Sequence, residues 1–403
     1  MSTDNNQITG KSNASAAGVP VAVSMQNVDV LFGPRARQRE AIRLLDSGKT
    51  REDILQETGV VLGVADASLD VPAGSISVLM GLSGSGKSSL LRCVNGLNTV
   101  TRGVLTVRTH DGMTDVAACK GRALRQLRRQ NLAMVFQQFG LLPWATVREN
   151  IGFGLSVRGE SESKIKQSVD AQLELVGLQA WADKQIHTLS GGMQQRVGLA
   201  RAFATDADIL LMDEPFSALD PLIREHLQDE LLTLQSRLKK TILFVSHDLD
   251  EALKLGNQVS IMDGGRIVQT GTVDDIVFAP ENDYVRRFVA NINPLSVLTA
   301  RSVMESVTPT SDEFRHEPTG LTVKLDQGSP VSAVYAGTAM TIARHDGQTG
   351  EHSAVVCVEQ RTPVNELLKL AAEQTTPLIV LNEAGQLCGL IQAQDLCSAL
   401  HSD

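Results

Sequence analysis

Apolar runs recur along the middle of the chain, with helical spacing between them. Four such runs, each bounded by polar turn residues, lie at residues 76–80, 133–136, 209–212 and 242–245. Strands that are buried on both faces of a parallel sheet have nearly continuous apolar sequences, whereas half-exposed strands alternate. The pattern therefore predicts an α/β unit built on a buried, largely parallel sheet.

The segment before this unit falls into three parts. Residues 1–23 are rich in Ser, Asn, Ala and Gly without an apolar period, and they are predicted to be disordered. From Ser24 an apolar alternation predicts a strand that ends at Phe32. Residues 35–58 change to helical spacing on both sides of Ser47-Gly48-Lys49, which predicts a pair of short helices, the second capped by Thr50.

A shift to Asn and Pro at residues 291–294 sets the predicted end of the first domain, which spans residues 24–290. In the remaining segment, a helix at 363–373 is predicted to precede a strand at 378–381, a turn at 382–385, a strand at 387–391 and a helix from Gln394. This order predicts a small α+β module.

Composition narrows the class of protein. The chain has 403 residues, of which 42% are hydrophobic and 21% charged, so it is long and apolar enough for two or three globular domains. The net charge of −9 argues against general nucleic-acid binding, which needs clustered positive charge. The charge is uneven, because residues 1–290 carry 31 basic and 33 acidic side chains whereas residues 291–403 carry 6 and 13.

Five cysteines without C-x-x-C spacing give no sign of a disulfide framework or a zinc site, and a reducing cytoplasm is expected. No segment has the arrangement of a secretory signal, and no stretch reaches the ~18 apolar residues of a spanning helix. A role at a membrane would therefore depend on a partner protein.

The strongest chemical signal is a glycine-rich loop between the apolar run at 76–80 and a helix-like stretch. Its pattern, G-x-x-x-x-G-K-[ST], is formed by Gly81, Leu82, Ser83, Gly84, Ser85, Gly86, Lys87 and Ser88, with Ser89 next in the helix. Backbone N–H groups of such a loop bind phosphate oxygens at a helix N-terminus. Lys87 is expected to bind the β and γ phosphates, and the Ser88 hydroxyl to ligate Mg²⁺.

An acidic pair follows another apolar run. The run at 209–212 ends in Asp213, and a parallel strand would place this carboxylate at the C-terminal edge of the sheet, where it holds the Mg²⁺ shell. Glu214 follows at once, placed to act as the general base on the attacking water. An acidic residue that ends a strand is usually only solvated, and the glycine-rich loop is what favours the catalytic role here.

Between the two motifs, Leu189-Ser190-Gly191-Gly192-Met193-Gln194-Gln195-Arg196 resembles the signature sequence of ATP-binding cassette (ABC) proteins. The resemblance covers residues 25–290 and implies a P-loop NTPase fold of the ABC type, with a parallel-sheet core, an antiparallel β subdomain and a helical signature subdomain at 140–200. It implies that Ser190, Gly191, Gly192 and Gln194 face the γ-phosphate bound by an opposite subunit. A homodimer that sandwiches two ATP molecules follows from one loop and one signature per chain.

Smaller elements match the same family. Gln137 resembles the glutamine that contacts Mg²⁺ and the attacking water, and His247 resembles the switch histidine at the γ-phosphate. Asp220 belongs to a stretch, residues 217–220, that resembles the loop crossing the dimer interface. Adenine usually stacks on an aromatic residue at the end of the first strand, which makes Phe32 the candidate; the alternative is that Phe32 is a core residue.

Five stretches resemble importers of quaternary amines such as glycine betaine, choline, carnitine and proline betaine, namely residues 35–58, 64–72, 139–150, 217–224 and 282–286. ATPase chains of that group end in paired cystathionine-β-synthase-type (CBS) modules. Residues 389–395 resemble the end of such a module, although Gln392 replaces the usual Thr or Ser, and residues 296–345 match only at 300–304. The tail, residues 295–403, is therefore expected to be a degenerate CBS-like regulatory domain.

The resemblance implies an energy-coupling ATPase at the cytoplasmic face of the membrane, which works with a transmembrane permease and a periplasmic or extracellular substrate-binding protein and binds no nucleic acid. The alternatives are an ABC ATPase for another small organic solute and a soluble ABC ATPase outside transport. A metabolic kinase would lack the signature, and an adenine-nucleotide sensor built on the tail would need a complete pair of modules. Related importers attract anionic lipid through a cationic tail, so the acidic tail predicts no sensing of that kind.

Overall fold

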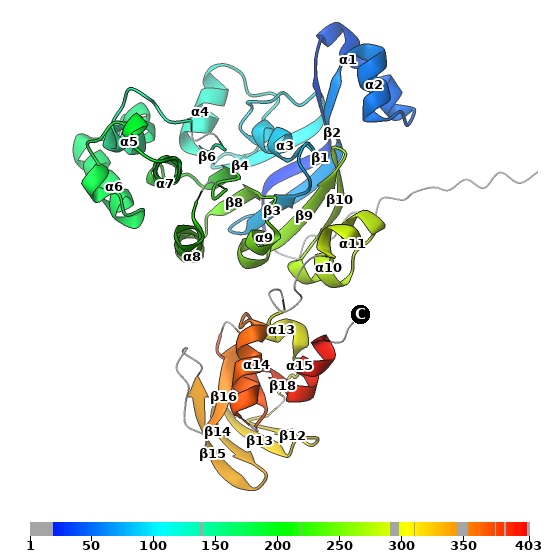
Figure 1. Cartoon of the computed structure of the whole chain (residues 1–403), viewed down its shortest axis with the longest axis vertical. Helices are drawn as coiled ribbons and strands as arrows, with labels where there is room; N and C mark the ends of the chain where they lie inside the picture. Colours follow the sequence, from blue (N-terminus) through cyan, green and yellow to red (C-terminus); the bar gives the residue numbers. More distant parts are fainter. Residues whose placement is uncertain are drawn as a thin grey trace, which may run out of the picture. The chain divides into compact units, whose positions relative to one another are not determined.

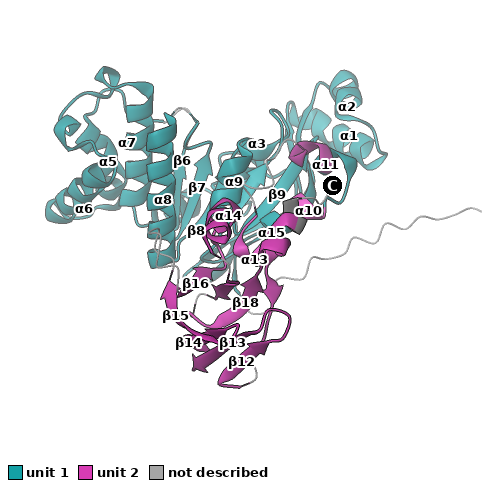
Figure 2. Ribbon diagram, turned by 60° about the horizontal axis from the view of Figure 1, so that its bottom comes forward, with its two compact units in different colours: residues 1–276, 280–285 teal, residues 277–279, 286–403 magenta. Residues whose placement is uncertain are grey.

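The computed structural model describes residues 19–137, 140–217, 219–290, 298–309, 311–344, 354–374, 376–382 and 384–400. The chain forms two compact units, coloured separately in Figure 2: Met1–Ile276 with Pro280–Val285, and Val277–Ala279 with Arg286–Asp403. This division comes a few residues before the boundary predicted at residue 290. The predicted linker at 291–294 lies outside the described residues.

A six-stranded sheet forms the centre of the first unit (Figure 1). Its strands, in order across the sheet, are β10 (Arg266–Gly271), β9 (Gln258–Asp263), β3 (Ile76–Met80), β8 (Thr241–Val245), β7 (Ile209–Asp213) and β6 (Leu132–Val135). All neighbours are parallel except β9 and β10, which form an antiparallel hairpin. Every residue of β3, β7 and β8 is buried, which explains their apolar sequences. The predicted parallel sheet is confirmed.

An antiparallel sheet shares its core with the central one. Its strands, in order, are β2 (Val61–Pro72), β1 (Val21–Phe32), β4 (Arg102–Thr109) and β5 (Gly112–Asp115). Helix α3 (Lys87–Val94) contributes Leu90 and Leu91 to one apolar cluster with Val28 and Leu105 of the antiparallel sheet and Leu79 of β3. The helix that follows the glycine-rich loop is therefore packed against both sheets.

The first strand begins earlier than predicted. β1 starts at Val21, so the prediction of disorder is wrong for residues 21–23, and residues 1–18 lie outside the described part of the chain. Pairing with β2 shifts register between Val21 and Val23, which buries both Ala22 and Val23. A bulge of this kind interrupts the alternation of buried and exposed positions by which a strand is recognised.

The two-helix insert is confirmed. Helix α1 (Arg35–Asp46) and helix α2 (Arg51–Thr58) connect β1 to β2. Thr50 caps α2 as predicted: its side chain accepts from the Asp53 N–H while the Asp53 carboxylate accepts from the Thr50 N–H. Gly59 ends α2 in the left-handed conformation, which glycine adopts at low cost.

The remaining helices lie within the first unit, apart from the last two, which it shares with the second. Their bounds are α4 (Arg122–Gln130), α5 (Val147–Arg158), α6 (Glu162–Leu175), η1 (Gln179–Trp181), η2 (Ile186–Thr188), α7 (Gly191–Ala204), α8 (Pro221–Leu238), α9 (Leu249–Leu255), α10 (Val273–Phe278) and α11 (Asp283–Val289). Helices α5, α6 and α7 pack on one another beside the edge strand β6, on the opposite side of that strand from β3 (Figures 1 and 2). Helices α10 and α11 each straddle the division between the units. Across the described parts of the chain, no helix combines the length and the apolar character needed to cross a membrane.

An eight-stranded mixed sheet forms the second unit. Its strands, in order, are β11 (Glu305–Ser306), β18 (Leu387–Ile391), β17 (Leu378–Leu381), β16 (Ala354–Glu359), β15 (Thr338–Arg344), β14 (Ser329–Tyr335), β13 (Leu321–Asp326) and β12 (Glu313–His316). Its helices are α13 (Ala300–Val303), α14 (Val364–Glu373) and α15 (Ala393–Leu400). Val356 and Val358 of β16 pack with the helices, whereas Val355 and Cys357 pack with residues of β13 and β14. The sheet thus has an apolar cluster on each face.

The end of this unit follows the predicted order of helix, strand, strand and helix, as α14, β17, β18 and α15, with Pro363 as the N-cap of α14. Strand β16, which precedes α14, was not predicted. The earlier part of the unit contains an antiparallel meander, β12 to β15, where a second module of the same kind would require a helix between strands. The unit therefore contains one β-α-β-β-α arrangement joined to a meander.

Candidate active site

The glycine-rich loop is shaped by contacts that exclude side chains. A Cβ atom at Gly81 would lie 2.1 Å from the Met262 carbonyl oxygen, and one at Gly86 would lie 2.5 Å from the Gly63 carbonyl oxygen. Both glycines also have positive φ angles, +141° and +105°. The loop can therefore turn tightly between β3 and α3 only with glycine at these two places.

Lys87 lies inside the loop. Its Nζ donates to the carbonyl oxygens of Gly81 at 2.8 Å and Leu82 at 2.9 Å, and the side chain is buried. Burial lowers the pKa of this ammonium group, while the charges of Glu214 and Asp213 act in the opposite direction. Within the described residues its hydrogen bonds are to neutral carbonyls, so this buried cation is placed to gain from an incoming anion.

Asp213 lies at the end of β7, as predicted, and is fully buried. One carboxylate oxygen accepts from the Ser88 hydroxyl at 2.7 Å, and the other accepts from Arg92 Nη2 at 2.9 Å. The structure thus brings together the predicted metal-binding pair, Ser88 and Asp213. Arg92 supplies the positive charge that a buried carboxylate requires.

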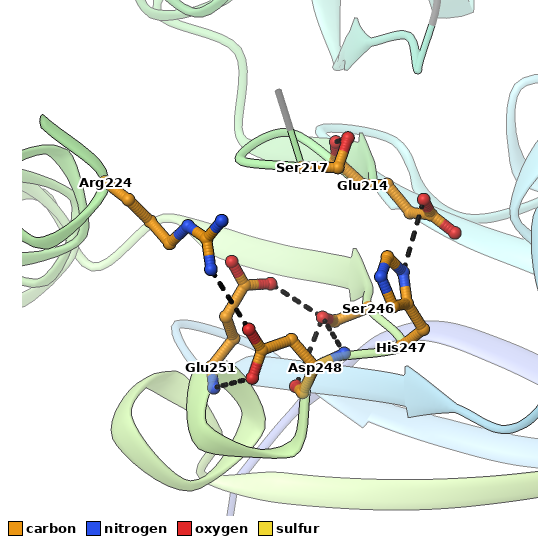
Figure 3. A pocket seen from close by; sticks show the side chains of 7 residues that line it. All are labelled: Glu214, Ser217, Arg224, Ser246, His247, Asp248 and Glu251. Carbon is orange, nitrogen blue, oxygen red and sulfur yellow. Dashed lines mark hydrogen bonds and ion pairs between the residues drawn. The ribbon is translucent and has the colours of Figure 1, made fainter. Parts of the chain in front are cut away.

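Glu214 is held by two of the predicted residues. Its Oε2 accepts from Gln137 Nε2 at 3.0 Å. The same oxygen lies 3.3 Å from His247 Nδ1, and Figure 3 shows this second contact. Glu214 has a φ of +49°, an uncommon conformation for a residue other than glycine, and its N–H donates to the Val245 carbonyl on β8. Neighbouring strands therefore fix the main chain of this residue and aim its side chain at Gln137 and His247.

The turn that carries His247 is built from polar contacts around a small pocket of about 40 Å³ (Figure 3). Ser246 donates to Glu251 Oε2 at 2.6 Å, and Arg224 of α8 donates to Asp248 Oδ2 at 3.2 Å. Burial raises the pKa of the Glu251 carboxyl, and the Ser246 hydrogen bond opposes this shift. The Arg224 contact joins the start of α8, just after Asp220, to the turn that carries His247.

Phe32 is separated in space from the glycine-rich loop by a single residue, Gly63. Its ring is 39% exposed, and a Cβ atom at Gly63 would lie 2.5 Å from its Cε2. Gly63 is the extra residue of a bulge, because Leu31 pairs with Leu62 and Val30 with Val64. The Gly63 carbonyl oxygen also lies against Gly86, the residue just before α3. Gly63 is therefore in contact with the Phe32 ring on one side and with the start of α3 on the other.

The signature residues lie elsewhere in the chain. Ser190 caps α7 by accepting from the Met193 N–H, Gly191 and Gly192 begin the helix, and Gln194 donates back to the carbonyls of Ile186 and Leu189. Helix α7 packs beside β6, which β7 and β8 separate from β3. The structure of one chain therefore does not bring the signature to its own glycine-rich loop.

Asp220 caps helix α8, because its side chain accepts from the Ile223 N–H at 3.1 Å. Two residues of the quoted motifs, Phe139 and Ala218, lie outside the described residues. Leu82, Ser83 and Ser89 lie in or next to the loop, Leu82 being highly exposed.

The loop meets a physical test for an anionic ligand. The Ser85 hydroxyl oxygen is buried and has no hydrogen-bond partner within the described chain. A buried polar atom without a partner costs about 1–3 kcal/mol, and a phosphate oxygen would remove that cost. Together with the buried Lys87 ammonium, this orphan hydroxyl fits a nucleotide phosphate.

Three arginines of the site were missed from the sequence. Arg92 pairs with Asp213, Arg224 pairs with Asp248, and Arg51 of α2 donates to the Gly84 carbonyl oxygen at 3.1 Å. Arg92 follows the loop by four residues on the same helix, which is the one signal in the sequence that points to it. The partners of the other two lie 24 and 33 residues away.

Comparison with known proteins agrees with this geometry. Residues 64–217 match the family described as ABC transporter. The glycine betaine/carnitine transport ATP-binding protein GbuA of Listeria monocytogenes is 38% identical over 394 residues, which cover 94% of this chain and 97% of GbuA. The trimethylamine N-oxide transport system ATP-binding protein TmoW of Ruegeria pomeroyi is 44% identical over 283 residues, which cover 70% of this chain and 81% of TmoW.

Among solved structures, the ATP-binding cassette MJ0796, in a dimeric post-hydrolysis state bound to ADP and Pi, aligns with a TM-score of 0.53 at 26% identity. That alignment covers 62% of this chain and 98% of MJ0796. The loop, the acidic pair and these similarities lead to one conclusion: this chain belongs to the ABC transporter family, as one of its ATP-binding proteins.

Proposed function

We propose that this chain is the ATP-hydrolysing, energy-coupling subunit of an importer for quaternary amines such as glycine betaine, choline or carnitine. The observation that carries the proposal is the similarity to GbuA, whose name specifies glycine betaine and carnitine, over 94% of the chain. A match of that length extends into the second unit. The higher identity to TmoW, over 70% of the chain, makes trimethylamine N-oxide the second candidate.

Hydrolysis at this site uses residues that the structure brings together. Glu214 takes a proton from the attacking water, a role typically worth ~10²–10⁴ in rate. Gln137 and His247, both beside its Oε2, orient it, and Lys87 and His247 stabilise charge on the transferring phosphoryl group. Ser88, Asp213 and Gln137 are the side chains that would hold Mg²⁺, which supplies charge neutralisation at the phosphates when bound.

The position of the signature supports a head-to-tail homodimer. Since α7 packs beside β6, with β7 and β8 between that strand and β3, Ser190, Gly191 and Gly192 are proposed to meet a γ-phosphate on another copy. Leu222, two residues after Asp220, is 76% exposed at the start of α8, where a partner's loop would cover it. The relative MJ0796 is described as dimeric.

An exposed apolar surface beside the Gln137 loop is the proposed contact with the permease. Trp144 is 74% exposed just before α5, and Phe153 and Val157, one helical turn apart on α5, are also exposed. Large exposed apolar side chains concentrated in one stretch of the chain, residues 144–157, are candidates for a protein interface. Closure of the ATP-bound dimer would move this surface and so change the side of the membrane to which the permease opens. A separate binding protein would deliver the solute at the outer face.

The second unit is proposed to be a degenerate CBS-like regulator, because its last part keeps one β-α-β-β-α arrangement. Its acidic composition argues against attraction to anionic lipid. In reconstituted transport, deletion of residues 295–403 is expected to leave activation by salt in place. Loss of salt activation on deletion, in proportion to the anionic lipid content, would contradict this.

The decisive experiment measures ATPase activity of the complex reconstituted with its permease and binding protein. Glycine betaine, choline, carnitine and trimethylamine N-oxide are added in turn, with a neutral sugar as the control. Stimulation by the quaternary amines supports the proposal, and stimulation by trimethylamine N-oxide alone favours the second candidate. If the purified chain associates with no permease, it is a soluble ABC ATPase and the import function is wrong.

A further inference from the structure

The two-helix insert reaches the phosphate-binding loop through one side chain. Arg51, the first residue of α2, donates from Nη1 to the carbonyl oxygen of Gly84 at 3.1 Å. Gly84 is the central residue of the loop and has a φ of +77°. Apart from its chain neighbours, no atom of the described structure lies within 4 Å of the place a Gly84 Cβ would occupy. Arg51 contacts this residue through its carbonyl oxygen and so ties the insert to the loop.

The position of Arg51 is fixed by the way the insert is seated. Ala41, Leu45 and Ile54 of the insert are buried in one cluster with Leu31 and Leu62, residues of β1 and β2. In addition, Gln38 Nε2 donates to the Gly33 carbonyl oxygen, and Arg102 of β4 pairs with Asp46 at 2.8 Å. With α2 capped at both ends, its first residue has little freedom to move away from the loop.

The hydrogen bond acts on one peptide group of the loop. In a trans peptide the C=O of one residue and the N–H of the next point in opposite directions. Arg51 holds the Gly84 carbonyl from the side of the insert, so the Ser85 N–H of the same peptide points to the other side. There it donates to the Leu82 carbonyl at 3.2 Å, the same oxygen that accepts from Lys87 Nζ.

We propose that Arg51 is a positioning residue for nucleotide binding, and that the insert thereby sets the affinity of the loop for phosphates. The guanidinium keeps the Ser85 N–H turned into the loop, where its hydrogen bond to the Leu82 carbonyl closes the turn that places the phosphate-binding residues. A cationic donor on the carbonyl also polarises the peptide and strengthens its N–H as a donor. The inference concerns nucleotide binding alone and is independent of the solute that is transported.

The test compares binding of MgADP and of magnesium pyrophosphate to the purified full chain by titration calorimetry. Arg51→Ala is expected to weaken both ligands by the same factor, about fivefold, as loss of one partly exposed charge-assisted hydrogen bond would give. Arg51→Lys, which keeps a cationic donor, should recover part of the loss. Arg39→Ala removes the same charge from an exposed position of α1 and should leave both affinities unchanged.

A kinetic measurement separates positioning from chemistry. The KM for ATP should rise in Arg51→Ala while kcat at saturating ATP stays within about twofold of the parent, because the residue acts before the chemical step. The proposal is overturned if Arg51→Ala binds both ligands like Arg39→Ala, or if it weakens ADP but not pyrophosphate, since the side chain would then act on the nucleoside. Neither result depends on the permease, so import would remain a separate question.

Discussion

Replacing Gly63 with alanine tests whether the Phe32 ring holds the adenine base. The added Cβ would lie 2.5 Å from Phe32 Cε2 and 3.1 Å from its Cδ2. Because carbon atoms in contact are ~3.5–4.0 Å apart, the ring or the strand must move by about 1 Å. The strand is pinned, since the Gly63 carbonyl touches Gly86 and the Ala65 N–H is hydrogen-bonded to Gly265. The ring, which is partly exposed, is therefore the part that gives way.

The size of the effect follows from the stacking energy. A base stacked on an aromatic ring is worth about 1–3 kcal/mol by alanine substitution, which is roughly 5-fold to 150-fold in affinity. Phe32→Ala is expected to show that loss for ADP. Gly63→Ala displaces the ring without removing it, so it should cost a smaller part, about 3-fold to 10-fold. Pyrophosphate has no base, and its affinity should change in neither variant.

The assay is calorimetric titration of MgADP and magnesium pyrophosphate into four full chains: the parent, the two single variants and the double variant. If Gly63 acts only through the ring, adding Gly63→Ala to Phe32→Ala causes no further loss. Two results would refute the reasoning. An unchanged ADP affinity in both single variants would remove Phe32 from the role of adenine platform, and a parallel loss for pyrophosphate would show that Gly63→Ala disturbs the glycine-rich loop itself.

Three further predictions rest on the same site. Glu214→Gln should keep ATP affinity, accumulate as an ATP-bound dimer in size-exclusion chromatography and lose ~10²–10⁴ in kcat; an unchanged hydrolysis rate would remove Glu214 from the role of base. Lys87→Ala should lose most nucleotide binding in equilibrium dialysis, because its ammonium is the buried cation of the loop, and retained affinity would contradict that role. Since burial raises the pKa of Glu251, the parent loses stability as pH rises from 4.5 through that raised pKa. Glu251→Gln has no carboxyl to titrate and should be free of this loss. Its free energy of unfolding in chemical denaturation, compared with that of the parent, should therefore gain with rising pH and show no such gain below pH 4.5. A difference between variant and parent that stays constant with pH would show that burial of the carboxyl is not the cause.

Local patterns were enough to predict the elements that carry the site. The apolar runs of β3, β7 and β8 are visible because both faces of each strand are buried, and Thr50 with Asp53 forms a cap that needs no distant partner. The meander of β12 to β15 was not predicted. Half of β14 faces solvent, so its sequence lacks a strong apolar run.

Contacts between distant residues account for what the sequence could not show. Arg92 and Asp213 lie 121 positions apart, and their pairing depends on how α3 lies across β7. Gly63 touches the loop only because a bulge in β2 gives that strand one residue more than β1 at this point. Such features depend on strand register and on the reach of long side chains, and neither leaves a repeating pattern in the sequence.

The order of strands has a consequence for synthesis of the chain. β3 carries the glycine-rich loop early in the sequence, yet its two neighbours in the sheet are β8 and β9, which are made more than 160 residues later. A nascent or truncated chain that ends before residue 241 contains the complete loop motif with an unpaired strand beneath it and without Met262, against which Gly81 packs. Such a fragment lacks the contacts that shape the anion site. Both edges of β3 stay unpaired and open to other chains until synthesis has passed residue 245, and one edge stays so until it has passed residue 263.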